Sequence, residues 1–329
     1  GLMGNKSAAK QKMREFGVPT VPGSEGVVKN YEEAREVIEE IGFPIMMKAS
    51  AGGGGRGMRI VRKEEEFADA FDTASHEAQT AFGVPDLYIE RYIANPRHIE
   101  VQVIGDKHGN TVHLGERECS VQRRHQKLIE ESPSPALTPE TRDEMTGIAA
   151  DAAKKLGYDS AGTIEFLYDE DGSFYFMEMN TRIQVEHPVT EMITSIDLIK
   201  TQILSAAGEK LPFKQKDITF QGHAIECRIN AEDPDTFMPS AGRVTAFNVP
   251  KGPGVRVDTA MYEGGVVPPN YDSLIAKVIT QGKDRDEAIA RMKRCLDLMV
   301  IEGVKTTAPL LNRVISHKKF RSGDYTTNF

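Results

Sequence analysis

Glycine occupies five of the six positions from 52 to 57, in the run Gly-Gly-Gly-Gly-Arg-Gly. So dense a run cannot form a helix or an ordinary strand, because each glycine adds backbone entropy that folding must remove. Its N–H groups can instead turn toward an anion without interference from Cβ atoms. Apolar segments at 45–48 and 58–61 flank the run and predict two strands joined by a hairpin. The pattern favours a flap that closes over phosphates, with a flexible surface turn as the alternative.

The glycine run differs from the two best-known phosphate-binding loops. It fits the letters GxGxxG, but the dinucleotide fingerprint needs a helix after the loop, and residues 58–61 indicate a strand. No Gly-Lys-Ser or Gly-Lys-Thr follows, so the run is not a Walker A loop. Lys48, four residues before the first glycine, is placed to bring a cation to the same phosphates. A lone lysine at such a position is more often a solvated edge residue.

Composition narrows the class of protein. A chain of 329 residues that is 39% hydrophobic is long and apolar enough for two domains. A net charge of −8 argues against a general nucleic-acid-binding surface. No apolar stretch reaches the length of a membrane span, and the three cysteines are far apart and show no disulfide or zinc spacing. We therefore expect a soluble, cytoplasmic globular protein that binds neither nucleic acid nor membrane.

Helix and strand signals alternate along the chain. Helices are predicted at 5–16, 30–42, 64–82, 138–157, 196–207, 284–300 and 306–317, and strands at 45–48, 58–61, 87–92, 98–104, 111–115, 163–168 and 173–180. From about residue 216 the pattern changes to shorter strands with Gly and Pro turns. This change predicts a domain boundary at 208–221.

The strands at 163–168 and 173–180 flank Asp169-Glu-Asp-Gly172, whose composition is typical of a hairpin turn. If Tyr168 pairs with Ser173, the register can be counted back along both strands.

In that register Glu165 lies opposite Phe176 and Thr163 lies opposite Glu178. Glu165, Glu178 and Asn180 then emerge on one face, close enough for the two carboxylates to share an ion. Two carboxylates and an amide oxygen are hard ligands that suit Mg²⁺ or Mn²⁺. The alternative is a set of salt bridges on an exposed face, but the apolar residues of the hairpin leave little of it to water.

Polar residues continue at alternate positions through Arg182, Gln184 and Glu186. The planar fork of Arg182 fits an oxyanion such as bicarbonate. Glu186 can act as a general base if it lies beside that anion. A surface ion pair is the usual role of an isolated arginine or glutamate, but the neighbouring carboxylate hairpin favours chemistry.

Four segments of the chain resemble the biotin carboxylases, and the resemblance covers essentially the whole sequence. The matching segments are Lys48–Met58, Glu116–Lys127, Glu178–Pro188 and Gly222–Pro234. They are long and nearly unbroken, and they occur in the family's order. Chance agreement is negligible.

The resemblance implies an α+β architecture in two parts. Residues 1–215 would form an ATP-grasp domain, whose mobile glycine-rich lid spans about 20–93. Residues 216–329 would form the biotin carboxylase C-terminal domain.

The resemblance also implies which residues contact ATP. Glu90, Arg91 and Ile93 would lie along the adenine edge, with Met58 and Leu167 packed on the ring. The full set implied for ATP is Lys6, Lys48, Gly53, Gly54, Met58, Glu90, Arg91, Ile93, His98, Gln122, His125 and Leu167.

The implied reaction is the ATP-dependent carboxylation of biotin. The implied bicarbonate site consists of Lys127, Arg182, Gln184, Val185 and Glu186. Glu186 would deprotonate bicarbonate, which would attack the γ-phosphate of ATP to give carboxyphosphate. Mg²⁺ or Mn²⁺ ions, held by Glu165, Glu178 and Asn180, would bridge the β- and γ-phosphates. Carboxyphosphate would decompose to CO₂ and phosphate, and Arg228 would stabilise the biotin enolate that captures the CO₂.

Two departures from the family pattern stand out. Position 91 is Arg where some relatives carry Lys, which changes little because the expected adenine contact is through the backbone. The chain begins at Gly1-Leu-Met-Gly-Asn-Lys6, which in this family follows a complete N-terminal α/β subdomain. The expectation is therefore a chain without that subdomain, with reduced stability or activity.

Two rival functions remain open at this point. Another ATP-grasp ligase, such as a carbamoyl-phosphate synthase, shares the lid and the metal hairpin. It lacks the Arg182–Glu186 run joined to the Gly222–Pro234 segment. A truncated, catalytically incomplete ATP-binding fragment is the second rival.

Partners follow from the resemblance as well. Biotin would be presented by a biotin carboxyl carrier protein, and a separate carboxyltransferase would pass the carboxyl group on. A homodimer is expected of the full-length protein. The favoured role is the first half-reaction of acetyl-CoA carboxylase, in fatty acid biosynthesis, with propionyl-CoA and pyruvate as other possible acceptors.

Overall fold

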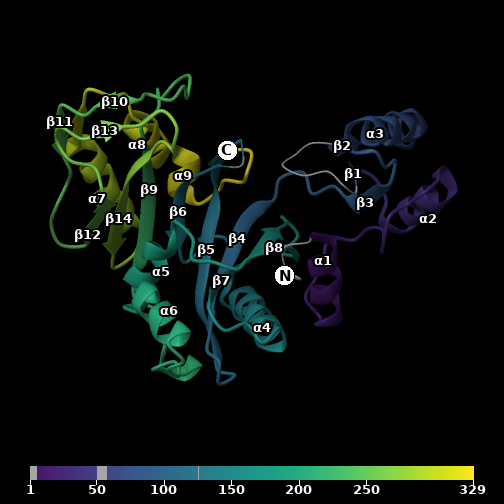
Figure 1. Ribbon diagram of the computed structural model, residues 1–329, viewed down its shortest axis with the longest axis horizontal. Coiled ribbons are helices and arrows are strands. Elements are labelled where there is room, and N and C mark those ends of the chain that lie inside the picture. The colour runs from purple at the N-terminus through teal and green to yellow at the C-terminus, as the bar shows by residue number, and fades with distance from the viewer. Residues whose placement is uncertain (1–5, 50–57, 125) are drawn as a thin grey trace.

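The structure, a computed structural model, describes residues 6–49, 58–124 and 126–329. A large antiparallel sheet runs through the middle of the molecule, and a smaller helix-and-sheet unit projects from one end (Figure 1). Within the described residues, no helix combines the length and apolar character needed to cross a membrane.

The central sheet has eight strands in the spatial order β12-β14-β9-β6-β5-β4-β7-β8. Every neighbouring pair is antiparallel. In sequence order the strands are β4 (Arg97–Gly105), β5 (Thr111–Arg123), β6 (Gln126–Ser132), β7 (Ala161–Tyr168), β8 (Phe174–Asn180), β9 (His223–Asn230), β12 (Val255–Thr259) and β14 (Leu274–Gly282). The β6–β9 pair joins strands from both sides of the predicted boundary at 208–221 into one sheet. The division at residue 215 stays a prediction.

Helices cover the two faces of this sheet differently. One face carries apolar side chains under α4 (Pro139–Lys155), and further along under α7 (Arg285–Leu298). On the opposite face lies the short α5 (His187–Thr194), which packs on β9, β5, β6 and β14. Because strand side chains alternate between faces, the residues next to the core positions of β4, β5 and β7 point toward α5.

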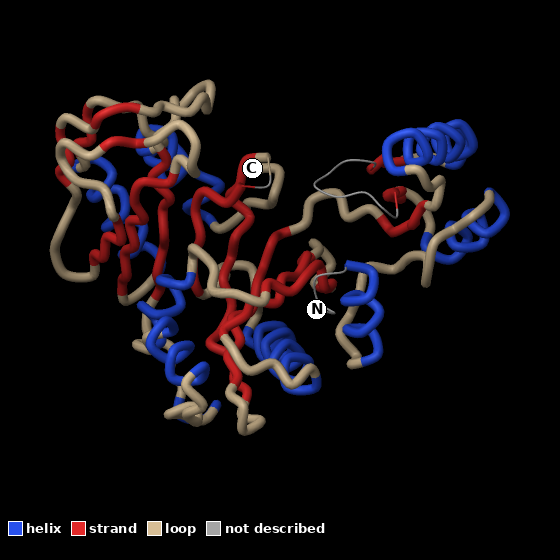
Figure 2. The backbone as a smooth tube through the Cα atoms, in the orientation of Figure 1, coloured by secondary structure: helices blue, strands red, loops and turns tan. Residues whose placement is uncertain are grey.

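The projecting unit is built on its own three-stranded antiparallel sheet, in the order β2-β1-β3. Its elements are α2 (Tyr31–Ile41), β1 (Ile45–Ala49), β2 (Met58–Val61), the 3₁₀ turn η2 (Glu64–Glu66), α3 (Phe67–Phe82) and β3 (Leu87–Arg91). It has a separate core, in which Ile45, Met47 and Ile89 of the sheet pack beneath the two helices. Figure 2 shows that loops connect it to the rest of the chain.

The remaining elements are short. They are α1 (Lys6–Glu15), α6 (Leu198–Ala206), η3 (Gln215–Asp217), β10 (Gly242–Arg243), β11 (Ala246–Asn248), β13 (Val266–Val267), β15 (Val300–Glu302), α8 (Ala308–Ser316) and α9 (Lys318–Ser322). Two small sheets, β10-β13 and β11-β15, flank α7 and α8 in the last third of the chain.

The predicted helices and strands are confirmed close to their expected positions, but several elements were not predicted, among them α9. The strand expected at 111–115 continues to Arg123, and β6 follows it directly. Charged residues at 116–118 hide the strand signal, because they are buried in paired form rather than exposed. The helix α5 was also missed, since Pro188 falls at its first turn, where proline is tolerated but resembles a break.

Candidate active site

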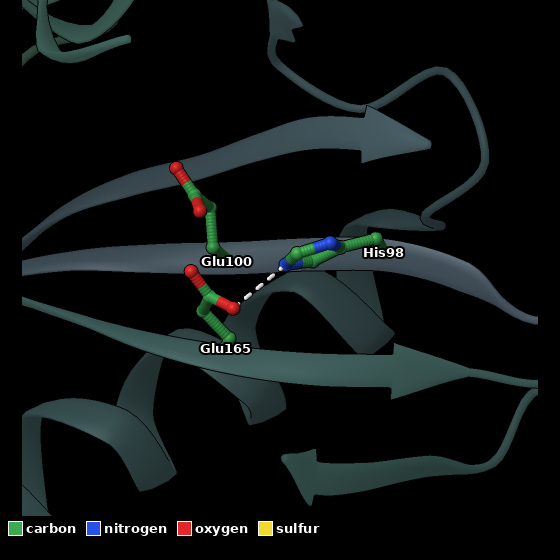
Figure 3. A group of neighbouring side chains, drawn as sticks. All are labelled: His98, Glu100 and Glu165. Atoms are coloured by element: carbon green, nitrogen blue, oxygen red, sulfur yellow. Dashed lines mark ion pairs between the residues drawn. The ribbon is translucent and has the colours of Figure 1, made fainter. Parts of the chain in front are cut away.

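A histidine and two glutamates from adjacent strands meet on the α5 face of the sheet (Figure 3). Glu100 on β4 pairs directly with Glu165 on β7, so their side chains share one face. His98 lies two residues before Glu100, and its Nε2 is 3.0 Å from Glu165 Oε2. All three side chains are buried. This arrangement brings together two predicted residues and one, Glu100, that was not predicted.

Lys127 connects this group to the segment before α5. Its Nζ lies 2.5 Å from both Glu100 Oε2 and Glu186 Oε1, and 3.3 Å from both Glu165 Oε1 and Gln184 Oε1. Burial would lower the pKa of Lys127, but the surrounding carboxylates, Glu100 foremost, raise it above its ordinary value. The ammonium group therefore remains charged and can hold an anion.

Glu186 lies between two cations. Its Oε1 contacts Lys127, and its Oε2 accepts a hydrogen bond of 2.8 Å from Nη2 of Arg228 on β9. Glu186 is 2% exposed and immediately precedes α5, so the start of that helix fixes its position. Three predicted catalytic residues from distant parts of the sequence thus form one contiguous cluster.

Arg117, on β5, contacts the cluster through Glu100 and is completely buried. Its Nε donates to Glu100 Oε1 at 2.5 Å, and its Nη1 donates to Gln102 Oε1 at 2.7 Å. The same Nη1 reaches Thr190 of α5 at 3.0 Å. Burial opposes its charge, but Glu100 and then Glu186 raise the pKa of Arg117 overall. Arg117 therefore fixes Glu100 and ties the sheet to α5.

The register of the carboxylate hairpin differs from the predicted one. Glu165 pairs with Glu178 rather than with Phe176, and Thr163 pairs with Asn180 rather than with Glu178. The turn is longer by one residue, since Tyr168 pairs with Phe174, and a bulge after Glu165 adds a second shift. The two carboxylates are consequently direct cross-strand partners and not diagonal neighbours.

The corrected register still suits a divalent cation. Glu165 and Glu178 stand opposite each other, and Asn180 Nδ2 is 2.9 Å from Glu165 Oε1. Burial would raise the pKa of Glu165, but His98, Lys127 and Gln184 hold it well below its usual range. An ionised carboxylate with a second one opposite is the ligand chemistry that Mg²⁺ prefers. The donor set fits the predicted metal.

The residues predicted to contact ATP are distributed along both sheets. Glu90 on β3 accepts from Lys48 Nζ at 2.5 Å and from Lys10 Nζ at 2.6 Å. Arg91 pairs with Asp169 in the hairpin turn at 3.1 Å, which links the projecting unit to β7 and β8. These contacts bring two predicted ATP residues, Lys48 and Glu90, together.

The other predicted ATP residues show varied exposure. Ile93 is buried, Leu167 is half-buried and Met58 is exposed. Gln122 pairs with Lys127 across β5 and β6. Gly53, Gly54, His125 and the side chain of Lys6 lie outside the described residues.

Two residues predicted to bind bicarbonate lie at the edge of the cluster. Arg182 is exposed, and its Nη1 donates to the carbonyl of Ile183 at 3.1 Å. Val185 contributes a backbone carbonyl, which accepts a hydrogen bond of 2.8 Å from Lys277 Nζ. Arg182 is therefore not gathered with Lys127 and Glu186 in this structure.

Four charged residues of the site were missed from the sequence: Glu100, Arg117, Glu130 and Lys277. A signal for Glu100 was present. Polar residues alternate with Ile99, Val101 and Val103 on β4, a pattern typical of a strand with one polar face. When both faces of such a strand are buried, its charged side chains are expected to pair with charges of opposite sign.

Two sequence families together match almost the whole chain. Residues 5–214 match the family described as carbamoyl-phosphate synthase L chain, ATP binding domain. Residues 226–329 match the family described as biotin carboxylase C-terminal domain.

Individual proteins similar to this chain are named as a biotin carboxylase or as a carboxylase subunit. The chain is 57% identical to biotin carboxylase 1 of Bacillus subtilis, over 99% of this chain and 73% of the relative. It is 55% identical to the small subunit of 2-oxoglutarate carboxylase of Hydrogenobacter thermophilus, over 100% of this chain and 70% of the relative. The biotin carboxylase domain of the latter enzyme, solved with MgADP, ADP and bicarbonate, superposes with a TM-score of 0.89 at 55% identity, over 100% of this chain and 73% of that one.

Proposed function

The chain belongs to the biotin carboxylase family and has its ATP-grasp fold, and from this premise we propose how its own residues carry out ATP-dependent carboxylation of biotin. Members of this family are ATP-dependent ligases that use ATP, Mg²⁺ and biotin. The observation that carries the residue assignment is the contact chain from Lys127 through Glu186 to Arg228. In that chain the cation assigned to the anion, the proposed general base and a second cation lie side by side.

The first step assigned to this cluster is the activation of bicarbonate. Lys127 and Gln184 bind the anion, with Arg182 swinging in from its exposed position. Glu186 takes the bicarbonate proton on a carboxylate oxygen. The resulting carbonate oxygen attacks the γ-phosphorus of ATP, and the bond to ADP breaks to give carboxyphosphate. Positioned charge, rather than covalent catalysis by the protein, supplies most of the stabilisation in such a transfer.

The phosphates of ATP are assigned to the carboxylate hairpin and the projecting unit. Glu165, Glu178 and Asn180 would hold the divalent cation, which neutralises charge on the β- and γ-phosphates. Lys48, His98 and the glycine segment would contact the nucleotide. Closure of the projecting unit over the site would exclude water and protect carboxyphosphate from hydrolysis.

The second step assigned to the cluster is carboxyl transfer. Carboxyphosphate decomposes to CO₂ and phosphate, the phosphate takes the N1 proton of biotin, and the biotin enolate captures the CO₂. Arg228 stabilises the enolate oxygen. Its guanidinium is half-buried and held by Glu130 and Glu186, so its orientation is set before biotin arrives.

We favour acetyl-CoA carboxylase, with a biotin carboxyl carrier protein, a carboxyltransferase and a homodimer of biotin carboxylase subunits. The similarity to a 2-oxoglutarate carboxylase subunit supports a keto acid acceptor as the alternative.

ADP release tests the function directly. The assay contains Mg²⁺, ATP, bicarbonate and free biotin, with each component omitted in turn. Turnover that requires both bicarbonate and biotin supports the carboxylase. Nucleotide that protects the fold against heat without any turnover would instead favour an ATP-binding chain that is incomplete as an enzyme. Turnover that requires ammonia rather than biotin would favour a carbamoyl-phosphate synthase.

A further inference from the structure

Two glutamates face each other in the interior of the central sheet, next to the site. Glu130 on β6 and Glu226 on β9 are direct cross-strand partners, and both are 0% exposed. Side chains in such a pair project from Cβ atoms only about 4.5–5.5 Å apart. The two carboxyl groups therefore lie within reach of each other on the face that carries Arg228.

The hydrogen bonds around this pair are incomplete. Glu130 Oε1 accepts from Arg228 Nε at 2.6 Å, but Glu130 Oε2 has no hydrogen-bond partner. Neither oxygen of Glu226 has one, among the residues that the structure describes. Lys277, on the neighbouring strand, directs its Nζ to the carbonyl of Val185 instead. Three buried carboxyl oxygens are thus without donors.

Two ionised carboxylates in that position would be very unfavourable. A buried charge without a partner costs several kcal/mol, and a second charge of the same sign beside it adds repulsion. A single proton placed between the groups removes one charge. It also gives Glu130 Oε2 a donor, the O–H of Glu226. Closely spaced carboxyl pairs commonly titrate as one unit for this reason.

We propose that Glu130 and Glu226 hold one proton between them, and that this carboxyl pair positions Arg228 toward Glu186. Burial raises the pKa of Glu130 to about 7, against the opposing effect of Arg228. Burial, and then the charge of Glu130, raises the pKa of Glu226 well above its usual value. The charged groups that face the pair are Arg228 of β9, Lys277 of β14, Lys127 of β6, and Glu186, which immediately precedes α5.

The carboxyl pair affects the active site because Arg228 contacts both Glu130 and Glu186. Its Nε is held by Glu130, and its Nη2 reaches Glu186 Oε2 at 2.8 Å. Nη2 also contacts Glu130 Oε1, so with one proton on the pair a single negative charge holds Nε and Nη2 while Nη2 still reaches Glu186. Loss of that proton would put a second charge behind Arg228 and draw it away from Glu186. This positioning role rests on the proposed function of Arg228, whereas the shared proton does not.

The shared proton is tested by infrared difference spectroscopy, which does not depend on turnover. The wild-type spectrum at neutral pH, minus that of E226Q, is expected to contain the carbonyl stretch of one protonated carboxylic acid. E170Q, a change of an exposed glutamate in the hairpin turn, is the matched control and is expected to show no such band. Absence of the band in the wild-type minus E226Q difference would overturn the proposal.

The positioning of Arg228 is tested by its guanidinium nitrogen-15 signals, assigned by their loss in R228K. In the wild type these signals are expected to shift as pH rises and the pair loses its proton. In E226Q, whose neutral amide imitates the protonated acid, that shift is expected to disappear. An equal shift in both proteins would contradict the proposal, even if the enzyme carboxylates biotin normally. E130Q, which removes the charged anchor, is expected to lower biotin carboxylation about tenfold while bicarbonate-dependent ATP cleavage falls less.

Discussion

Glu165 on β7 and Glu178 on β8 are direct cross-strand partners, so their carboxylates project from the same point on the α5 face of the sheet. Glu165 is already in contact with His98 and Lys127, which keep it ionised. Glu178 lies on β8, the strand at the end of the central sheet, and is partly exposed. The two glutamates therefore make different contributions to a cation site.

Glu178→Gln is expected to raise the Mg²⁺ concentration needed for half-maximal ADP release, by about tenfold or more, because a charged oxygen ligand is lost. Glu165 and its buried partners remain, so the melting temperature should change little. Titration of turnover with Mg²⁺ measures the effect. E170Q serves as the control for a lost negative charge nearby, and an identical Mg²⁺ dependence in both variants would contradict the metal assignment.

Glu186→Gln is expected to retain ATP binding and to lose biotin carboxylation by about 10²–10⁴-fold, the usual contribution of a general base. The amide keeps the shape of the side chain but accepts no proton. Nucleotide binding is measured by thermal protection, and carboxylation by transfer of labelled bicarbonate to biotin. Carboxylation at the wild-type rate would exclude Glu186 as the base.

Arg228→Ala is expected to reduce carboxyl transfer more than bicarbonate-dependent ATP cleavage, since Arg228 is assigned to the biotin enolate. It also leaves buried Glu130 without its arginine and Glu186 with Lys127 alone, so a stability loss of about 3–5 kcal/mol is expected. Arg228→Lys retains a charge without the two-ended fork and separates the two effects. Equal losses of ATP cleavage and carboxyl transfer in the lysine variant would argue against the enolate role.

Arg117→Ala is expected to destabilise the protein by about 3–5 kcal/mol, because it leaves Glu100 with Lys127 alone in a fully buried site. Chemical denaturation measures the change. Arg35→Ala removes an exposed arginine paired with Glu39 at 3.4 Å on α2, and should change stability by less than about 1 kcal/mol. Similar losses in the two variants would mean that Arg117 contributes no more than a surface ion pair.

Acid is expected to weaken the fold through Glu131, on the opposite face of β6 from Glu130. Burial would raise its pKa, but hydrogen bonds from His223 and Arg285 lower it from 4.5 to about 2. The pKa is depressed in the folded state, so this stabilisation is fully present above about pH 4.5 and is lost as pH falls toward 2. Its size is on the order of 3 kcal/mol.

The measurement for Glu131 is the free energy of unfolding between pH 6 and pH 3, in the wild type and in Glu131→Gln. The variant should be less stable at the upper end, and the difference should shrink as the pH falls. A difference that stays constant across this range would show that Glu131 does not titrate with folding.

The sequence predicted most helices and the hairpin, and it singled out Glu165, Glu186 and Arg228, which the structure joins through Lys127 into one cluster. It could not predict the register of β7 and β8, because a bulge is a response to packing and leaves no reliable pattern in composition. Counting back from the turn therefore paired Glu165 with the wrong residue, although the face on which it lies was right.

Arg117 and Glu100 show a second limit of sequence reasoning. A charged residue in a strand normally indicates a solvent-exposed face, and only the three-dimensional pairing shows that both are buried together. Arg182 shows the reverse case. Its spacing with Gln184 and Glu186 predicted a shared site, yet the chain turns before α5 and leaves Arg182 in solvent.

The pairing of β6 with β9 has a consequence for how the enzyme tolerates a break in its backbone. Lys127 and Arg228 reach Glu186 from strands that are joined by cross-strand hydrogen bonds, and the loop between α6 and β9 takes no part in that geometry. A chain cut at 208–221 would thus yield two fragments, each holding part of one sheet and each lacking a neighbour for an inner strand. Such fragments should reassemble when mixed, and the split enzyme would rebuild its active site by completing a sheet rather than by docking two finished domains.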